Sequence, residues 1–354
     1  MKMIYVGSLQ RTPDRDSGWI RSFKELGCTV VPFSSHIHYP KVGLVKSIWY
    51  KICNRFNIGF YNKEMQKSLL LLAEQECPEW VHIQLPLGFD RKTIKSLQVK
   101  NIFVTEYFND DAFSKGQPFG LHWKFRYTLK IYDGHFVWRE RDIEVYKRAG
   151  ADYVAHSPPY YDPERVFIPS PLKKQEDFLA DAAFLGHWEN DWRVDCLDAL
   201  SCRGLRVILR GGPEGWETAI KGREIGKLSP VRWADDVEYR RIYSNVVAGI
   251  CFFSKINNDE WTRRALEIIA LGGVLVCERT NEANNYFKDR EEAFFFSSID
   301  ELIDIVCDLK ENPEMRETVR LAGHKRLMDD GHTILARADQ VYQFVLASKF
   351  ENVV

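Results

Sequence analysis

The sequence predicts an α/β protein with two Rossmann-like halves, each built on a parallel sheet. Short apolar runs that read as strands alternate with helical patterns up to about residue 157, and the alternation restarts at about residue 181. A segment rich in proline and polar residues, 158–175, separates the two series and is typical of a hinge. A chain of 354 residues is also too long for one compact core, so two domains are expected.

The first half begins with an expected strand over 3–8 and a helix over 17–27, for which Ser17 and Gly27 are plausible caps. The repeated order of strand and helix implies βαβ units with parallel neighbouring strands. The other expected strands of this half are 28–33, 80–85, 101–107, 134–138 and 151–157, and the other helices are 63–76, 91–98 and 141–150.

The second half repeats this order and ends in helices. The expected strands are 181–186, 205–211, 246–253, 274–277 and 293–298, and the helices are 191–204, 237–245, 262–270, 299–312, 313–330 and about 333–350. We therefore predict an N-terminal domain over 1–171 and a C-terminal domain over 172–335. A final helix over 336–354 is then available to pack back on the N-terminal domain.

Net charge, cysteine usage and residue spacing argue against several classes of protein. The net charge of −1 gives no bulk electrostatic reason to bind nucleic acid, so no nucleic-acid partner is expected. The eight cysteines are scattered without a C-x-x-C pair, which is typical of buried reduced thiols, and no signal peptide or membrane span is evident. These features predict a cytoplasmic protein. No metal-ligand spacing occurs, so neither a metal nor another cofactor is expected.

Residues 259–287 contain the most informative motif, an Arg-x-x-Glu pair (Arg264, Glu267) before Gly272 and Gly273. Positions three apart share one face of a helix. Such a pair can be an ordinary surface ion pair, which is its commoner role. It can also hold a phosphate through the cation and two sugar hydroxyls through the carboxylate.

The C-terminal half resembles the nucleotide-sugar glycosyltransferases of the GT-B fold (glycosyl transferases group 1), in particular the CgeB-like branch of spore maturation type. The resemblance covers about residues 180–345. Its ordered motifs are AAFLGHW, VILRGG, IYSNVVAGICFF, T-x-R-x-x-E-x-x-A-x-G-G from Thr262, F-x-D-x-E-E-A from Phe287, SSIDEL and a late GHT. Many retaining members carry two glutamates eight positions apart, and Leu275 stands eight positions after Glu267. The sequence therefore does not predict whether transfer inverts or retains configuration.

The resemblance implies a metal-independent transferase with a nucleotide-diphosphate sugar as donor. Glu267 would then bind the ribose hydroxyls, and Arg264 would contact the diphosphate. Each further candidate also has a structural reading as a turn, packing or solvated residue. These further donor-site candidates are Gly186, Arg193, Gly212, Trp233, Gly273, Val274 and Thr280.

An inverting mechanism would need a base on the acceptor hydroxyl, expected in the N-terminal half. The candidates at strand ends are Glu106, Asp110 and Asp111, each with an ordinary loop carboxylate as the alternative. The acceptor class stays open between a glycan, a lipid-linked sugar and a protein. Two other functions also stay open: a nucleotide-sugar epimerase on the same fold, and a non-catalytic relative that binds a glycan or assembles a coat.

Residues 41–56 mix Lys41, Lys46, Lys51 and Arg55 with six large apolar side chains. A basic amphipathic helix of this kind can lie on an anionic membrane surface. The alternative is a helix packed on its own domain with its lysines extended to solvent. The first interpretation predicts peripheral contact with the inner face of the membrane.

Overall fold

The computed structural model describes residues 1–9, 16–40, 43–168 and 177–351. The chain divides into two compact units, Met1–Pro158 with Ile334–Val354 as the first and Pro159–Thr333 as the second. The sequence places the divisions somewhat later, at 171/172 and at 335/336. Residues 169–175 of the predicted hinge lie outside the described residues.

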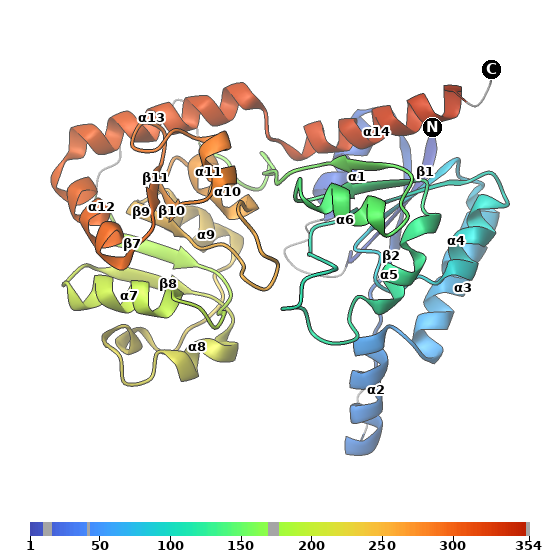
Figure 1. The fold of residues 1–354 in the computed structure, drawn as a ribbon, viewed down its shortest axis with the longest axis horizontal. Helices are drawn as coiled ribbons and strands as arrows, with labels where there is room; N and C mark the ends of the chain where they lie inside the picture. The colour runs from blue at the N-terminus through green and yellow to red at the C-terminus, as the bar shows by residue number, and fades with distance from the viewer. Residues whose placement is uncertain (10–15, 41–42, 169–176, 352–354) are drawn as a thin grey trace. The chain divides into compact units, whose positions relative to one another are not determined.

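The first unit is a six-stranded parallel sheet in the order β2-β1-β3-β4-β5-β6 (Figure 1). Its strands alternate with helices, as the apolar runs predict. The strands are β1 (Lys2–Gly7), β2 (Thr29–Ser34), β3 (Trp80–Gln84), β4 (Phe103–Phe108), β5 (Gly134–Val137) and β6 (Val154–His156). The helices are α1 (Asp16–Glu25), α2 (Leu44–Phe56), α3 (Phe60–Glu76), α4 (Arg91–Gln98), α5 (Trp123–Thr128), η1 (Leu129–Ile131), α6 (Asp142–Arg148) and α14 (Ile334–Glu351).

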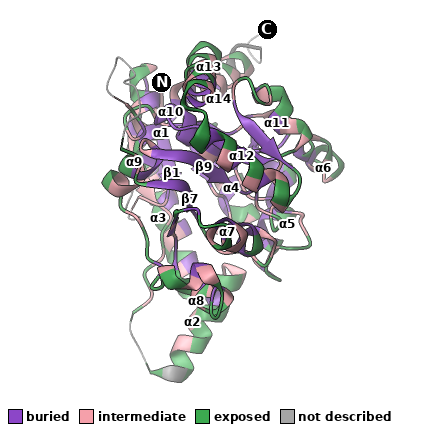
Figure 2. Ribbon diagram, turned by 90° about the vertical axis from the view of Figure 1, so that its left-hand side faces the viewer, coloured by how far each residue is buried: buried purple, intermediate pink, exposed green. Residues whose placement is uncertain are grey.

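Helices cover both faces of this sheet because successive strand side chains point to opposite faces. One face packs Ile4 and Val104 against α3, α4, α5 and α6. The other face carries Trp80 and Tyr107 against Trp19 and Phe23 of α1, with ring centroids 5.1 Å apart in the pairs Phe23–Trp80 and Trp19–Tyr107. α14 packs beside α1. The inner strands β1, β3, β4 and β5 are consequently buried along nearly their whole length, whereas the edge strands β2 and β6 are partly exposed (Figure 2).

The second unit is a five-stranded parallel sheet in the order β11-β10-β9-β7-β8. One core lies between the sheet and α7 with α12, and the other lies between the sheet and α9, α10 and α13. The strands are β7 (Ala180–Leu185), β8 (Val207–Arg210), β9 (Val246–Cys251), β10 (Leu275–Glu278) and β11 (Phe294–Phe296). The helices are α7 (Arg193–Cys202), α8 (Pro213–Ala219), η2 (Glu224–Leu228), α9 (Asp236–Tyr243), α10 (Arg263–Ala270), α11 (Asn281–Tyr286), α12 (Ile299–Glu311) and α13 (Pro313–Asp330).

The structure confirms the predicted α/β class with two parallel sheets. The sequence did not predict the short helices α5, α8 and α11 or the two 3-10 turns. Within the described ranges, no helix combines the length and the hydropathy that a bilayer span requires.

Candidate functional site

The carboxyl ends of the strands of the second unit meet at one edge of its sheet. β7, β8, β9 and β10 are all parallel, so the loops that start after Leu185, Arg210, Cys251 and Glu278 leave from the same edge. Ligands of open α/β sheets bind at this carboxyl edge. A ligand at this edge would meet the cations, hydrogen-bond acceptors and glycines that line these loops.

Arg264 lies in the first turn of α10, which follows β9 and begins at the carboxyl edge. Its guanidinium carbon stands 5.2 Å from the centroid of the Phe184 ring on β7. A Cβ atom on Gly186 would lie 2.7 Å from Arg264 Nη2 and 2.7 Å from Phe184 Cζ. Glycine at 186 therefore allows the arginine to reach the backbone at the end of β7. The structure thus brings together two of the predicted residues, Gly186 and Arg264.

Arg264 differs from Arg193 and Arg210, two other arginines near this edge, because its positive charge is not paired with a carboxylate in the described part of the chain. Arg193 is paired with Asp191 through Nε–Oδ1 and Nη2–Oδ2 contacts of 2.7 Å each, and Arg210 donates to Glu238 at 2.9 Å. No carboxylate of the described residues lies within salt-bridge distance of Arg264. Arg264 is partly exposed as a residue, and a guanidinium without a paired carboxylate can bind an anionic ligand.

Arg193, a candidate for a phosphate contact, is engaged by protein groups. Its side chain is buried, and Nη1 also donates to the His187 carbonyl oxygen at 2.7 Å. Together with the Asp191 pair, this contact fixes the loop between β7 and α7. In this arrangement Arg193 is therefore neither solvated nor available to a ligand, because its N–H groups already donate to Asp191 and to the His187 carbonyl oxygen of the loop.

Glu267 is buried one turn after Arg264, and both of its oxygens are engaged. Oε1 lies 3.1 Å from Arg165 Nη1 and 3.2 Å from Arg263 Nε, and Oε2 accepts from the Tyr239 hydroxyl at 2.6 Å. Burial and then the Glu267 charge raise the pKa of Tyr239 well above its usual range, so this hydroxyl stays protonated and donates. Sequence reasoning missed Arg165 and Tyr239, which no local pattern connects to Glu267.

A second group of predicted residues lies at the end of β8. A Cβ on Gly212 would lie 2.7 Å from Trp233 Cζ2, so the tryptophan ring rests on this glycine. The His187 ring stands edge-on to the Trp233 ring, with centroids 4.8 Å apart. Trp233 is 53% exposed, so it is not a core packing residue. This arrangement offers an aromatic surface at the carboxyl edge.

Thr280 follows β10 and serves as the N-cap of α11. Its Oγ1 accepts from the Ala283 amide at 3.0 Å and donates to the Glu260 carbonyl oxygen at 2.5 Å. These contacts join the loop that precedes α10 to the start of α11. The structure thus gives Thr280 a capping role, and a loop contact to a donor sugar would have to compete with it.

The prediction that the Gly273 and Val274 amides face a phosphate is wrong. Both residues precede β10, so they lie at the amino edge of the sheet, opposite the carboxyl edge. The Gly273 amide donates to the Ile268 carbonyl oxygen at 2.9 Å, and Val274 is buried in the core. The reason is geometric: α10 crosses the sheet from one edge to the other, so its two ends cannot serve the same ligand.

In the first unit, Glu106 cannot serve as the predicted base in this arrangement. Its side chain is fully buried on β4, where Oε1 lies 2.6 Å from His135 Nδ1 on β5. Burial raises the pKa of Glu106, and the His135 hydrogen bond opposes that shift. No acceptor could reach this carboxylate without opening the core. The predicted role of Glu106 as a base is therefore corrected: the residue forms a buried polar pair with His135.

The other two candidates follow β4 in the loop that leaves its carboxyl end. Asp111 is buried, its carboxylate accepts from the Phe113 amide at 2.9 Å, and it lies 3.3 Å from Arg141 Nη2. Asp110 is only half-buried. Of the three predicted acids, Asp110 has the most accessible side chain.

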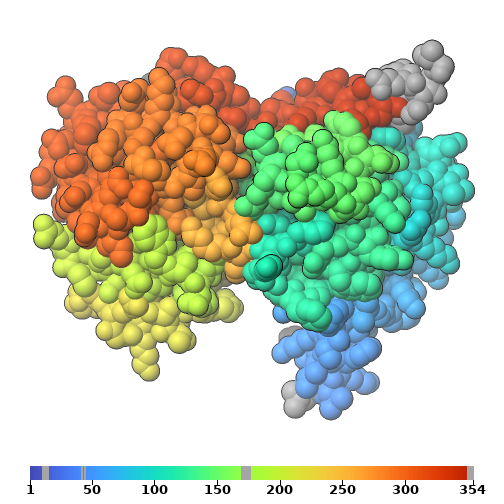
Figure 3. Space-filling model, in the orientation of Figure 1, coloured from blue at the N-terminus to red at the C-terminus, as the bar shows by residue number. Residues whose placement is uncertain are grey.

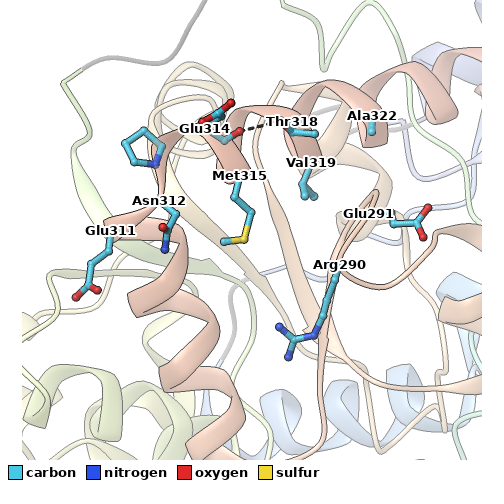
Figure 4. Close-up of a pocket in the computed structure, with 10 residues that line it drawn as sticks. Arg290, Glu291, Glu311, Asn312, Glu314, Met315, Thr318, Val319 and Ala322 are labelled. Carbon is cyan, nitrogen blue, oxygen red and sulfur yellow. Dashed lines mark hydrogen bonds between the residues drawn. The ribbon is translucent and has the colours of Figure 1, made fainter.

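A surface hollow of the second unit lies elsewhere. It is lined by Arg290, by Glu311 at the end of α12 and by Met315 and Val319 of α13 (Figure 4). Because Arg290 precedes β11, the hollow lies near the amino end of that strand and not at the carboxyl edge. Over the described ranges, no group of three or more His, Cys, Asp or Glu side chains is arranged to hold a metal ion.

Comparison with known proteins gives a family match for part of the chain. Residues 193–343 match the family model described as "Glycosyl transferase-like". This range contains Arg264 and Glu267 and begins at the first residue of α7. No curated protein matches the chain.

Solved structures match almost the whole chain at low identity. Sucrose-phosphate synthase from Thermosynechococcus elongatus is 10% identical with a TM-score of 0.64, over 98% of this chain and 100% of that one. HepE from Anabaena, in complex with UDP and glucose, is 11% identical with a TM-score of 0.64 over the same shares. A putative UDP-N-acetylglucosamine 2-epimerase from Listeria monocytogenes is 12% identical with a TM-score of 0.56, over 100% of this chain and 97% of that one.

At these identities the structural matches establish the fold alone, and it is the GT-B fold. The narrower CgeB-like assignment stays a prediction. The glycosyl transferase-like match covers residues 193–343, and the similarity to solved structures in the GT-B fold extends over almost the whole chain.

Proposed function

We propose that this protein transfers a sugar from a nucleotide-diphosphate donor to a hydroxyl group of an acceptor. The observation that carries the proposal is Arg264, a partly exposed residue at the carboxyl edge whose guanidinium has no carboxylate of the described residues within salt-bridge distance. In the reaction the bond between sugar C1 and the diphosphate oxygen breaks, and the diphosphate leaves with an additional negative charge. A fixed cation stabilises that charge as it develops.

Two further residues would complete the donor site. Glu267 would accept from ribose hydroxyls, replacing or sharing its contacts to Arg165 and Tyr239. Trp233 would stack on the nucleobase, because its ring is exposed next to Gly212. The structure of HepE with UDP makes a uridine nucleotide the first donor to test.

The acceptor hydroxyl would lose its proton as its oxygen bonds to sugar C1. We assign this proton to Asp110, the most accessible of the three acids after β4. The acceptor is a glycan, a lipid-linked sugar or a protein, and no metal or cofactor takes part in the proposal.

A ligand panel tests the donor. Thermal unfolding of the full chain should shift upward with one nucleoside diphosphate and its sugars, because a ligand that binds only the folded state stabilises it. No shift with UDP, GDP, ADP, TDP or their sugars would contradict the proposal. Slow release of free sugar from the identified donor would then separate a transferase from a non-catalytic binder.

Product analysis tests the alternative. The epimerase on the same fold would convert a nucleotide sugar to its epimer without releasing the nucleotide, whereas a transferase releases the nucleoside diphosphate. Similarity to the putative 2-epimerase establishes only the shared fold. Chromatography of the nucleotide products decides between the two activities.

A further inference from the structure

Helix α2 exposes an apolar stripe to solvent. Val45, Ile48, Trp49 and Ile52 occupy positions i, i+3, i+4 and i+7, which form one face of a helix. All four side chains are exposed, and Val45 is 81% exposed. An exposed apolar helix face of this kind commonly marks an interaction surface. Lys41 of the predicted 41–56 segment lies outside the described residues.

The same helix is attached to its unit by a different face. Cys53 is buried, and Tyr50 contacts Tyr39 and Tyr61 with ring centroids 5.1 Å and 5.7 Å apart. The Asn57 side chain, just after the helix, donates to the Leu121 carbonyl oxygen at 3.2 Å. Because these contacts fix the rotation of α2, the stripe is directed away from its own domain. The alternative of a helix packed on its own domain, with its lysines extended to solvent, does not account for the four exposed apolar side chains of the stripe.

The stripe continues onto the body of the first unit. Phe56 lies four positions after Ile52, and its ring stands 6.1 Å from the ring of Phe119, which is 89% exposed. The Trp123 indole, also exposed, donates to the Phe56 carbonyl oxygen at 2.8 Å. We call the exposed set the α2 surface: Val45, Ile48, Trp49, Ile52, Phe119 and Trp123.

The charges of α2 are all of one sign. Lys46, Lys51 and Arg55 are exposed, and the helix contains no aspartate or glutamate. Around the helix axis, the three bases lie on both sides of the stripe, since successive residues are offset by about 100°. α2 also projects beyond the rest of its unit (Figures 1 and 3), so it presents a convex face instead of a groove.

We infer that the α2 surface binds an anionic lipid membrane. Apolar and aromatic side chains would enter the interface between headgroups and acyl chains, and the flanking bases would meet lipid phosphates. A convex basic helix face suits a planar anionic surface, whereas a peptide helix requires a groove. The inference does not depend on the donor chemistry, so it can fail or succeed independently of the proposed function.

Sedimentation with lipid vesicles tests the inference on the full chain. The protein should sediment with vesicles of equal parts phosphatidylcholine and phosphatidylglycerol, and should stay in the supernatant with phosphatidylcholine alone. Val45→Asp should lower the bound fraction at least about tenfold, because it places a negative charge in the contact. Val99→Asp is the matched control: Val99 is 83% exposed in the same unit, just after α4, and the variant should bind like the parent.

A variant with fewer positive charges separates the electrostatic contribution to membrane binding from the apolar contribution. Lys46→Gln with Lys51→Gln should weaken binding about fivefold per base, and added salt should weaken the parent similarly. Three outcomes would overturn the inference: no sedimentation of the parent with the anionic vesicles, equal sedimentation with both vesicle types, or equal losses for Val45→Asp and Val99→Asp. A parent dimer that Val45→Asp converts to a monomer would assign the surface to a second copy instead.

Discussion

The Arg264 guanidinium is held against the face of the Phe184 ring, 5.2 Å from its centroid, and not by a carboxylate. An aromatic face attracts a cation without neutralising it, so the contact with Phe184 leaves the positive charge of Arg264 in place. Phe184 belongs to β7 and Arg264 to α10, and both lie at the carboxyl edge of the second sheet. This relationship distinguishes Arg264 from the paired Arg193 and Arg210.

We predict that Arg264→Met weakens binding of the nucleoside diphosphate by roughly 10- to 100-fold, because a charge-assisted contact to phosphate is lost. Methionine keeps an unbranched apolar side chain against Phe184, so folding should be little affected. Isothermal titration of the purified variant with the nucleotide found in the ligand panel measures the loss.

Arg316→Met is the matched control for this prediction. Arg316 also lies over a phenylalanine ring, 4.4 Å from the centroid of Phe178. Phe178 precedes β7, so this pair lies at the amino edge of the sheet. Equal losses of affinity in Arg264→Met and Arg316→Met would show that the effect is structural and not a ligand contact.

Glu267→Gln should separate a ribose contact from a phosphate contact. The variant should bind the nucleoside diphosphate at least about tenfold more weakly, whereas its affinity for inorganic pyrophosphate should not change. It should also lose roughly 2 to 4 kcal/mol of unfolding free energy, because Arg165 and Arg263 lose a buried partner. Competition binding and chemical denaturation measure the two effects.

Tyr239→Phe provides the comparison for Glu267→Gln. It removes only the hydroxyl that donates to Glu267 Oε2, at a cost of about 1 kcal/mol in unfolding free energy. If pyrophosphate and nucleotide affinities fell together in Glu267→Gln, the carboxylate would act by positioning the nearby cations and not through the ribose.

The sequence predicted the layers of the fold because strand and helix periodicities are local properties. It also placed Arg264 and Glu267 on one helix face, as the spacing requires. It could not predict that Arg263, and not Arg264, pairs with Glu267. That outcome depends on Phe184 and Gly186, which draw Arg264 toward β7 from some eighty positions earlier in the chain.

Two other predictions depended on facts that sequence spacing does not contain. Gly273 lies only six positions after Glu267 in the sequence, which suggested that both bind one ligand. Helix α10 starts at the carboxyl edge of the sheet, however, and its length brings the chain to the opposite edge before Gly273. In the pattern of two acids eight positions apart, Leu275 occupies the position eight residues after Glu267. An acid, Asp259, instead lies eight residues before Glu267. The stereochemistry of transfer therefore requires analysis of the product anomer.

Gly186→Ala tests the close approach of Arg264 without changing any charge. The new Cβ would lie 2.7 Å from Arg264 Nη2, so the guanidinium would have to move. We expect nucleotide affinity to fall several-fold, with the melting temperature changing by only a few degrees. Gly43→Ala serves as control, since a Cβ there meets nothing within 4 Å and the residue has φ of −60°. Unchanged affinity in Gly186→Ala would contradict the placement of Arg264 in the site.

The first unit should lose stability in acid. Burial lowers the pKa of His82 from 6.5 to about 3 and that of His122 from 6.5 to about 4. In the unfolded chain both imidazoles bind protons below about pH 6.5. In the folded unit each imidazole stays neutral until the pH falls to its lowered pKa, about 3 for His82 and about 4 for His122. The stabilisation present above pH 6.5 is therefore lost as pH falls, by about 1.4 kcal/mol per pH unit for each group.

His122→Phe checks the acid effect. Neither ring nitrogen of His122 has a hydrogen-bond partner within the described part of the chain, so an aromatic replacement leaves no group unpaired. The variant should raise the melting temperature relative to the parent at pH 5 more than at pH 8, as followed by circular dichroism. A pH-independent gain would refute titration as the cause.

Asp110→Asn tests the assignment of the acceptor base. Removing a general base should lower kcat by about 100-fold or more, whereas the donor Kd should not change because no donor contact is removed. Glu106→Gln is the comparison, since its carboxylate is fully buried and paired with His135. That variant should unfold at lower temperature but keep the activity of its folded fraction. If Glu106→Gln lost kcat and Asp110→Asn did not, the buried pair would open during turnover and the assignment to Asp110 would be wrong.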